Sequence, residues 1–548
     1  MKKTIVFLTG ATGTMGYAGM QEILRYPDQY ELRILARPSK KNKELLAPLA
    51  SNHSSLAIIW GDLTNYEDVL KGVTGADIVL HVGGMVSPQA DYRPKATLRT
   101  NITAANNITK AVLAQPEEHQ PKVVYIGSVA QMGDRREPLH WGRAGDPICV
   151  SAYDHYGLTK ALAERIITDS GIKCWASLRQ SGILYPAILK NYDPIMFHVP
   201  IRGVLEWATV EDSGRLLERV CRPDVPAKFW NNYYNIGSGA EYRLSNYEFE
   251  CLLLDAIGCP KPEKIFNANW FTTRNFHGMW YIDGDKLEDM LHFRANVPVK
   301  EYFAQMAKAE SLPWGIKFAS KTHIAKLFPR CVKLAMRQMA NKEEHGTQTW
   351  VRTAKSFALN RERIERLLMK QFDMSHEEVE TLRIKAEKRV AAYYGTLEAY
   401  EAIPDWTRMN LSHNSNTPVL LDHGYDESKD VDSLTDAELN KAAAFRGGKY
   451  LGNDLWEDAN GHQFKAGRRL ILLGGHWSPF DMPCPYDQAT LDKMNERLST
   501  LNIQLSTISW HWDRVAKQNP FFAQLWAPLH DASEDNIYGP EVFEGWEK

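Results

Sequence analysis

The amino-terminal part of the chain is predicted to be an α/β protein built on a Rossmann-type, doubly wound parallel sheet. Residues 4–8 form a short apolar run that leads into a cluster of glycines and then into a helical segment. Strand and helix signals alternate through about residue 185, which implies right-handed crossovers and helices on both faces of a parallel sheet. A small substrate lobe and a mainly helical, partly irregular carboxy-terminal region are expected to follow.

The glycine cluster comes directly after the first predicted strand and reads Thr-Gly-Ala-Thr-Gly-Thr-Met-Gly over residues 9–16. Gly10 is free to adopt backbone angles closed to other residues, Gly13 lets a pyrophosphate approach the backbone, and Gly16 lets helix and strand pack closely. The phosphates would bind N–H groups at the start of the following helix. An ordinary glycine turn is the alternative, which the flanking strand and helix disfavour. The predicted contacts are Gly10, Thr12, Gly13, Thr14, Met15 and Gly16.

The second predicted strand, residues 31–36, indicates which nucleotide is bound. An acidic residue after this strand binds the free 2′-hydroxyl of NAD, whereas a cation pairs with the 2′-phosphate of NADP. The chain has Arg37 there and Lys40 shortly after, so NADP is favoured over NAD; a solvated basic loop is the alternative. Asp62, after the third predicted strand, is expected either near the adenine amino group or at the cap of the next helix.

Tyr156 and Lys160 lie four residues apart in a predicted helix, residues 152–169. This spacing puts both side chains on one helix face, where an ammonium group favours the phenolate and lowers the tyrosine pKa from about 10 toward neutrality. Such a tyrosine exchanges a proton with a carbonyl or alcohol oxygen. The spacing alone is typical of many surface pairs. Ser128, just after the predicted strand 123–126, adds a hydroxyl that would hold the substrate oxygen beside the tyrosine.

Together, the glycine cluster, Ser128 and the Tyr156 and Lys160 pair resemble the motifs of the extended short-chain dehydrogenase/reductase family, in its epimerase/dehydratase-like branch. The resemblance covers about residues 1–310. It implies that Tyr156 is the general acid/base, that Lys160 binds the nicotinamide ribose and tunes the tyrosine, and that Ser128 orients the substrate oxygen. It also implies that Asn101 supports the lysine through water. The implied cofactor contacts further include Leu63, Val82, Gly83, Gly84, Tyr156, Lys160 and Ile183.

Two departures from the family pattern narrow the predicted reaction. Val129 and Ala130 stand where nucleotide-sugar dehydratases of the family carry an acidic pair, so dehydration is disfavoured. The segment 186–209 is short and contains the apolar stretch 194–200, unlike the long insert of nucleotide-sugar enzymes. We therefore predict an oxidoreductase that transfers a hydride between nicotinamide and a carbonyl or alcohol of a relatively apolar small molecule.

Two other functions stay open from the sequence. One is a nucleotide-sugar epimerase that retains NAD through each cycle. The other is a non-catalytic NADP sensor, against which the intact set of Ser128, Tyr156 and Lys160 argues, because a sensor needs no proton donor. The resemblance also implies a homodimer face on the helix that carries Tyr156.

Composition limits the partners and the location. The 548 residues have a formal net charge of −2, so no general attraction to nucleic acid is expected. Seven cysteines without paired spacing, and an apolar run after the first residues that is shorter than the roughly seven residues of a signal peptide, point to a reducing cytoplasm. No apolar run reaches the roughly 18 residues of a membrane span.

The domain assignment places the nucleotide-binding domain at residues 1–310, with the lobe mainly at 186–310, a helical region at 311–410 and a Trp- and His-rich region of unknown role at 411–548. Residues 317–342 are basic and amphipathic. A membrane-surface helix is one interpretation. A helix packed on its own protein, with a solvated cationic face, is favoured.

The last region also resembles a zinc-ribbon pattern around His462 and His476. The positions where that pattern carries cysteines hold Asp458, Ser478 and Asp481. Structural zinc prefers thiolate and imidazole ligands. No bound metal is therefore predicted, and a degenerate ribbon, or histidines and tryptophans used in packing, is favoured.

Overall fold

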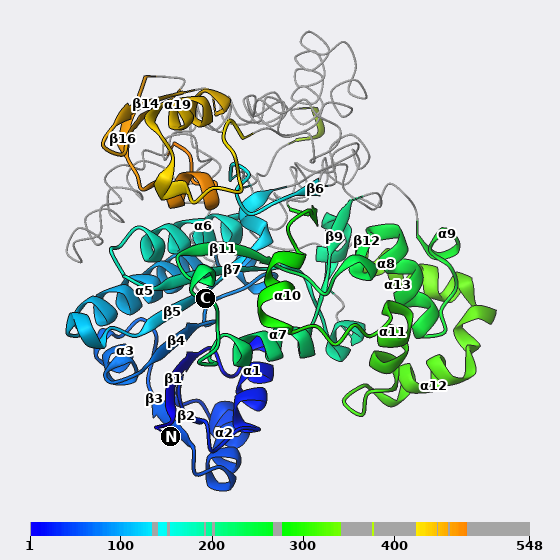
Figure 1. The fold of residues 1–548 in the computed structure, drawn as a ribbon. Helices are drawn as coiled ribbons and strands as arrows, with labels where there is room; N and C mark the ends of the chain where they lie inside the picture. Colours follow the sequence, from blue (N-terminus) through cyan, green and yellow to red (C-terminus); the bar gives the residue numbers. More distant parts are fainter. Residues whose placement is uncertain are drawn as a thin grey trace.

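The computed structural model describes most of the first 340 residues and one compact part of the carboxy-terminal region (Figure 1). The described residues are 2–133, 141–148, 150, 154–190, 193–199, 203–266, 277–340, 375–377, 423–446, 448–458 and 461–478. Most of the helical region predicted at 311–410 beyond residue 340, and Asp481 of the ribbon pattern, lie outside these residues.

A seven-stranded sheet with all strands parallel forms the centre of the protein, in the order β11-β7-β5-β4-β1-β2-β3. The order reverses between β1 and β4, so the loops that follow these two strands diverge to opposite faces and leave a crevice for a ligand. The predicted doubly wound Rossmann-type fold is confirmed. The strands are β1 (Thr4–Thr9), β2 (Tyr30–Ala36), β3 (Leu56–Trp60), β4 (Ile78–His81), β5 (Lys122–Ser128), β7 (Trp175–Gln180) and β11 (Asn232–Ile236).

Helices cover both faces of this sheet, and the strands are apolar on both sides for that reason. Val6 and Leu8 of β1 contact one core, whereas Phe7 between them contacts the other. The first core is closed by α1 (Thr14–Leu24), α2 (Lys40–Asn52), α7 (Val210–Arg219) and α10 (Asp285–Leu291). The second is closed by α3 (Tyr66–Val73), α5 (Pro94–Leu113) and α6 (His155–Thr168), with the short α4 (Gln89–Tyr92) beside them.

The chain after β7 builds the lobe from short pieces, as predicted, but it returns to the main body through α7 and β11, and again through α10. Two-stranded sheets and a separate apolar core around Leu244, Phe249 and Phe303 hold the lobe together. Its elements are β8 (Ile183–Leu184), η3 (Pro186–Lys190), η4 (Pro194–His198), β9 (Val204–Glu206), β10 (Ala208–Thr209), β12 (Arg243–Ser245), α8 (Asn246–Ala256), α9 (Pro262–Ile265), β13 (Trp280–Tyr281) and α11 (Val299–Lys308).

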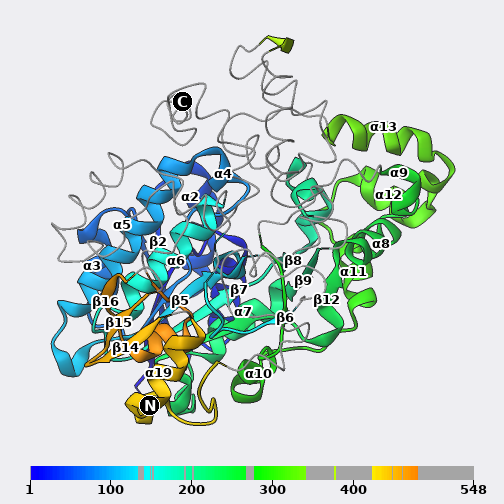
Figure 2. The same cartoon turned by 90° about the horizontal axis from the view of Figure 1, so that it is seen from above.

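Three further helical segments lie against the outer end of the lobe, far from the main sheet in both views (Figure 1 and Figure 2). They are α12 (Trp314–Thr322), η8 (Ile324–Leu327) and α13 (Pro329–Ala340). Within the described ranges, no helix combines the length and the apolar character needed to cross a bilayer.

Residues 423–478, called here the carboxy-terminal module, combine one helix with a three-stranded antiparallel sheet. The prediction of a mainly helical region did not foresee these strands. The apolar residues of the module, including the fully buried Trp456, belong to the same core as α5 and α6, so the module is part of the main body. Its elements are η10 (Val431–Ser433), α19 (Asp436–Phe445), β14 (Lys449–Gly452), β15 (Leu455–Glu457), β16 (Gln463–Lys465) and η11 (Arg469–Leu473).

Close packing of α1 and α7 depends on glycine, which gives a test of the fold. A Cβ atom on Gly214 would lie 2.8 Å from the Cβ and 2.9 Å from the carbonyl carbon of Ala18. We expect Gly214→Ala to destabilise the protein by about 1–3 kcal/mol through overpacking, although alanine favours helix. Gly315→Ala in α12, where no atom lies within 4 Å of the new Cβ, is the control and should leave the thermal unfolding temperature unchanged or raise it. Equal effects of the two substitutions would contradict this packing.

Candidate functional site

The loops after β1 and β4 form a cradle that only glycines permit. Gly10 has a φ of +78°, and a Cβ on it would lie 2.7 Å from the Cα of Gly83. A Cβ on Gly16 would lie 2.2 Å from the Gly10 carbonyl oxygen, so the first turn of α1 packs directly on the loop after β1. Gly13 is the N-cap of α1 and brings no side chain to its first N–H groups, which suit an anion. Thr12, Thr14 and Met15 complete this turn.

A buried hydrogen-bond chain fixes the two loops to one another. The Thr9 hydroxyl accepts from the Gly83 N–H at 3.0 Å and lies 3.0 Å from His81 Nδ1. Burial, with a smaller contribution from Lys160, lowers the pKa of His81 to about 3. The imidazole is therefore neutral, and its tautomer determines whether Nδ1 or the Thr9 hydroxyl is the donor. Val82 and Gly83, both predicted cofactor contacts, are held at the mouth of the crevice by this chain.

The α6 helix carries Tyr156 and Lys160, the predicted proton-transfer pair. Asp154 caps the helix by accepting from the Gly157 N–H at 2.8 Å, which sets where the first turn begins. Tyr156 is half-buried on this turn, and Lys160 follows one turn later. The Lys160 ammonium donates to the Ile126 carbonyl at 2.8 Å, near the end of β5. Burial lowers the pKa of Lys160 to about 8 against the opposing effect of Glu164, so the group is still protonated at neutral pH.

Ser128 ends β5, two residues beyond the carbonyl that holds Lys160. Its Oγ accepts from the Ala130 N–H at 3.2 Å, and its N–H donates to Gln131 Oε1 at 2.8 Å. These bonds fix the backbone and the hydroxyl oxygen and leave the hydroxyl proton to be donated elsewhere. Val129 and Ala130 are buried and apolar, so no side chain next to Ser128 along the chain can carry a proton.

Asn101 lies close to Lys160 but is engaged elsewhere. Its Oδ1 accepts from the Met85 N–H at 2.8 Å, and its Nδ2 donates to Thr159 Oγ1 at 2.9 Å. The side chain therefore joins the loop after β4 to α6, next to Gly84, where an added Cβ would lie 2.9 Å from Asn101 Oδ1. A water-mediated contact of Asn101 with Lys160 stays a prediction.

The residues predicted to meet the adenosine lie along the ends of β2 and β3. Arg37 follows the last residue of β2 and is exposed, as is Lys40 at the start of α2. Asp62 uses Oδ1 to accept from the N–H and hydroxyl of Thr64, each at 2.8 Å. The cap of the next helix is Asn65, so the predicted alternative that Asp62 caps this helix is not what the structure has.

Leu63 and Ile183, two further predicted cofactor contacts, lie beyond the carboxyl ends of β3 and β7. A Cβ on Gly83 would lie 2.7 Å from Leu63 Cδ1, which puts Leu63 beside the crevice, and its carbonyl accepts from Asn107. Ile183 is half-buried in β8, just beyond the carboxyl end of β7, and pairs with Ala208 of β10. Both residues are at the carboxyl ends of the parallel strands, where open α/β sheets bind ligands.

A buried polar network behind α6 was missed by the sequence analysis. Glu164, one turn after Lys160, is fully buried and forms an ion pair with Arg179 of β7 at 2.6 Å. Its second oxygen accepts from the Ser177 hydroxyl at 2.5 Å and from Arg179 Nε at 3.0 Å. Burial disfavours the charge, but Arg179 and a hydrogen bond from His476 lower the pKa of Glu164 well below its ordinary value. The sequence did contain one signal for this network, because Glu164 is an acidic residue on a helix face that is otherwise apolar.

The carboxy-terminal module supplies part of this network. His476 Nε2 lies 2.6 Å from Glu164 Oε1, and the Gly474 carbonyl accepts from Arg179 at 2.5 Å. The Gly475 carbonyl accepts from the Ile148 N–H at 2.8 Å, in the segment between Ser128 and α6. The sequence analysis assigned His476 to packing or to a degenerate ribbon, because a contact across this separation leaves no local pattern.

The other positions of the ribbon pattern form hydrogen bonds with one another. Asp458 Oδ2 accepts from the Ser478 hydroxyl at 2.6 Å and lies 3.1 Å from His462 Nδ1. Among the described residues, no three histidine, cysteine or acidic side chains are grouped as metal ligands would be. The prediction that no metal is bound stays a prediction.

Comparisons with known proteins bear on the amino-terminal part of the chain. Residues 7–186 match the 3-beta hydroxysteroid dehydrogenase/isomerase family. This match runs through the glycine cradle, Ser128 and α6. This part of the chain is therefore similar to the extended short-chain dehydrogenase/reductase family. The resemblance inferred from the motifs is thereby confirmed.

Two curated relatives match the short-chain dehydrogenase/reductase part over limited lengths. A UDP-glucose 4-epimerase of Rickettsia typhi is 31% identical over 115 residues, which cover 20% of this chain and 33% of that protein. The 3 beta-hydroxysteroid dehydrogenase type 7 of Mus musculus is 25% identical over 171 residues, which cover 30% of this chain and 45% of that protein. The chain thus spans between a third and about half of the length of these relatives.

Solved structures with similarity to this chain include two described as complexes with NAD. One is the dTDP-glucose 4,6-dehydratase of Bacillus anthracis, with 13% identity, coverage of 60% of this chain and 99% of that chain, and a TM-score of 0.45. The other is the Bordetella bronchiseptica enzyme WbmH, with 17% identity, coverage of 56% and 96%, and a TM-score of 0.41.

The contact of His476 with α6 predicts a pH effect on the stability of the dehydrogenase/reductase part. Burial lowers the pKa of His476 to about 4 from 6.5, against the effect of Glu164, with Arg179 and Arg165 lowering it further. The unfolded chain therefore binds a proton at a higher pH than the folded one, and stability falls as the pH drops below about 6.5. From pH 7.5 to 5 this histidine should account for a loss of about 2 kcal/mol.

The test compares urea unfolding at both pH values in the wild type, in His476→Gln and in His119→Gln. The amide of His476→Gln still donates a hydrogen bond but does not titrate, so its stability should change less between the two pH values. His119 is exposed in η1 (Glu117–His119), and its replacement should leave the wild-type pH dependence intact. A pH dependence in His476→Gln as steep as that of the wild type would contradict the assignment.

Proposed function

We propose that the protein is an NADP-dependent oxidoreductase that transfers a hydride between nicotinamide and a carbonyl or alcohol of a relatively apolar small molecule. One observation carries the proposal. The buried Lys160 ammonium is held at the carboxyl end of β5, near Ser128 and one helical turn from Tyr156. This group lies at the same edge of the sheet as the glycine cradle after β1. The similarity to the short-chain dehydrogenase/reductase family supports it.

The cradle fits a dinucleotide because its shape excludes side chains. A Cβ at Gly10 or Gly16 would meet backbone atoms within 3 Å. Glycine at these positions therefore lets neighbouring backbone segments approach one another closely. Gly10, Gly13, Gly16 and the N-terminus of α1 would hold the pyrophosphate, and Val82, Gly83 and Gly84 the adjoining ribose. Such a nucleotide, when bound, supplies or accepts the hydride.

Arg37 supports NADP over NAD. It is exposed directly after β2, where the adenosine ribose of such folds lies, and it would form a charge-assisted, bidentate contact with a 2′-phosphate. Lys40 adds a second cation at the start of α2. Asp62, Leu63 and Ile183 would line the ends of the same crevice.

Three side chains would carry the proton and position the substrate. The Ser128 hydroxyl donates to the substrate oxygen, and the Tyr156 hydroxyl gives up or accepts the proton on that oxygen. Lys160, held by the Ile126 carbonyl, favours the phenolate through its charge and binds the nicotinamide ribose. Asn101 and Thr159 keep the loop after β4 against α6, which holds this geometry together.

The substrate is proposed to be relatively apolar for two reasons. Val129 and Ala130 offer no acid for dehydration, and the match to a family named for hydroxysteroid dehydrogenases concerns an apolar alcohol. A nucleotide-sugar epimerase with retained NAD is the second candidate, favoured by the match to a UDP-glucose 4-epimerase. Protein purified with stoichiometric NAD and no net turnover of added nucleotide would support that candidate instead.

The first test removes the proposed acid/base. Tyr156→Phe should lower kcat for alcohol oxidation by about 100-fold or more, because the base that accepts the alcohol proton is lost, while the Kd for NADPH stays within about twofold. Turnover is measured as NADPH formation with a panel of hydroxysteroids as apolar alcohols, and Kd by fluorescence titration. Tyr66→Phe on α3 is the matched control and should retain activity. Full activity of Tyr156→Phe would exclude this tyrosine as the acid/base.

The second test addresses the nucleotide. Arg37→Ala should weaken NADPH binding by roughly tenfold to a hundredfold, as expected for a lost hydrogen bond to a charged group, and leave NADH binding unchanged. Arg33→Ala, which removes a cation of β2 that donates to the Thr74 carbonyl, controls for a general charge effect. If Arg37→Ala weakened the binding of NADPH and NADH equally, Arg37 would not contact the 2′-phosphate. The same conclusion would follow if Arg33→Ala weakened NADPH binding as much as Arg37→Ala does.

A further inference from the structure

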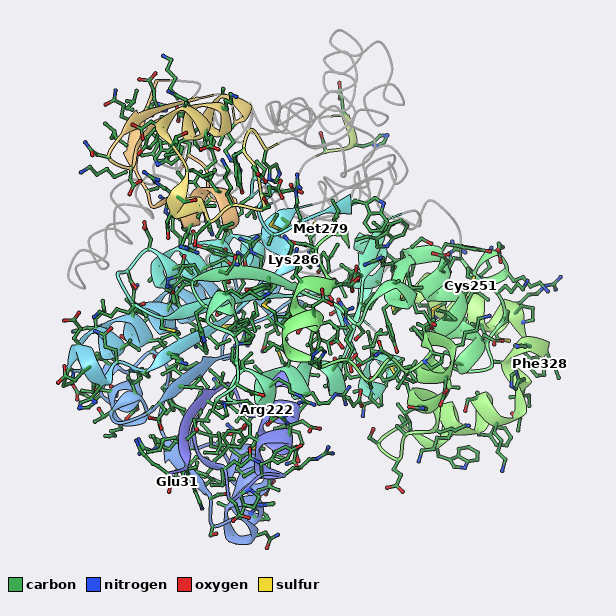
Figure 3. The ribbon with its side chains drawn as sticks, in the orientation of Figure 1. Glu31, Arg222, Cys251, Met279, Lys286 and Phe328 are labelled. Carbon is green, nitrogen blue, oxygen red and sulfur yellow. The ribbon has the colours of Figure 1, made fainter. Side chains whose placement is uncertain are left out.

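The outer end of the lobe exposes large apolar side chains in an unusual concentration. We define the basic patch as the solvent-facing side of α12, η8 and α13. Six of the twelve exposed large hydrophobic residues of the described chain fall within residues 314–334. Trp314 is 77% and Leu327 75% exposed, and Phe328 stands at the outer edge of the molecule in Figure 3. The six residues are Trp314, Phe318, Ile324, Leu327, Phe328 and Leu334.

Packing on the lobe does not account for these side chains. The buried sides of the same helices use other residues, namely Ile316 against the core of the lobe, and Val332, Met336 and Met339 against Phe197, Leu254 and Phe266. The approach of α12 is close, since a Cβ on Gly258 would lie 2.4 Å from the Ala319 carbonyl oxygen. The helices are thus anchored on one side and present a second apolar surface on the other. The helices pack on their own protein and expose cations, as the interpretation favoured from the sequence expects, but they also expose large apolar side chains, which that interpretation did not include.

Cations surround the exposed apolar residues. No acidic residue occurs between Ser311 and Lys342, and the outward face carries four exposed cations. One of them, Lys326, pairs with Asp255 of α8 at 3.0 Å; no such ion pair is found within the described residues for the other three. The exposed cations are Lys321, Lys326, Arg330 and Arg337.

We propose that the basic patch docks the protein onto the surface of an anionic lipid bilayer. Trp314, Leu327 and Phe328 enter the boundary between headgroups and acyl chains, and the cations contact lipid phosphates and carboxylates. The helices have nine and twelve residues, so they lie in the interface and do not cross it.

A bilayer explains the patch better than a protein partner does. The cores of protein interfaces are depleted of lysine, whereas here Lys321 and Lys326 lie among the exposed apolar residues along the chain. Tryptophan, phenylalanine and leucine interleaved with basic residues are typical of helices bound at membrane surfaces. The docking requires neither the nucleotide nor the proposed redox reaction.

The test is co-sedimentation of the full-length protein with vesicles of phosphatidylcholine alone and of phosphatidylcholine with phosphatidylserine. We expect binding at least about tenfold stronger to the anionic vesicles, and weaker binding as salt screens the charges. The double variants Leu327→Ser with Phe328→Ser, and Arg330→Glu with Arg337→Glu, should each lower the partition coefficient by about tenfold or more. Circular dichroism and thermal unfolding check that each variant folds.

Matched substitutions on the carboxy-terminal module serve as controls. Leu451→Ser removes a 43% exposed leucine and Lys465→Glu reverses an exposed charge, and both should bind vesicles as the wild type does. Equal binding of the patch variants and the wild type would overturn the proposal, and so would binding that ignores lipid charge. Absence of vesicle binding, with self-association on gel filtration that the Leu327→Ser, Phe328→Ser variant abolishes, would show that the patch contacts a second copy of the chain instead.

Discussion

A carboxylate sealed from water behind α6 is the constraint on which the candidate site depends. Glu164 and Arg179 both have no exposed side-chain area, and a buried charge is tolerated only when its partners are complete. The partners of Glu164 come from two other parts of the protein: Arg179 and Ser177 from β7, and His476 from the carboxy-terminal module. Such a network fixes the rotation and position of α6, and with it the height of Lys160 and Tyr156 above the sheet.

The part of the site proposed to bind the nucleotide depends on the opposite feature, the absence of side chains. Gly10, Gly16 and Gly83 let three backbone segments meet at distances that a Cβ would forbid. The strand order reverses between β1 and β4, which leaves this crevice open. The hydrogen bonds of Thr9 with His81 and Gly83 hold the loops after the two strands together. The Glu164 network positions α6, and the close approach of the glycine loops forms the cradle. Both halves of the candidate site therefore lie at one edge of the same sheet.

The parts outside the family match extend this core in two directions. The carboxy-terminal module joins the core next to α6 and reaches the segment between Ser128 and Tyr156 through Gly475. The helices α12 and α13 join the lobe at its far end, where they bury one apolar face and expose another. A homodimer through α6, implied by the family resemblance, stays a prediction, and the module already shares a core with that helix.

Local patterns were enough to predict the doubly wound sheet, the glycine cradle and the position of Tyr156 and Lys160 one turn apart on one helix. A strand that ends in glycines, and two residues four apart on a helix, are determined by neighbours along the chain. The contacts of His476 with Glu164 and of Asn101 with Thr159, the strands of the module and the exposure of Leu327 were decided by the tertiary structure. The contacts and the strands join residues that are distant in sequence, and the exposure of Leu327 depends on which helix face the rest of the protein covers. A local sequence pattern reports neither of these.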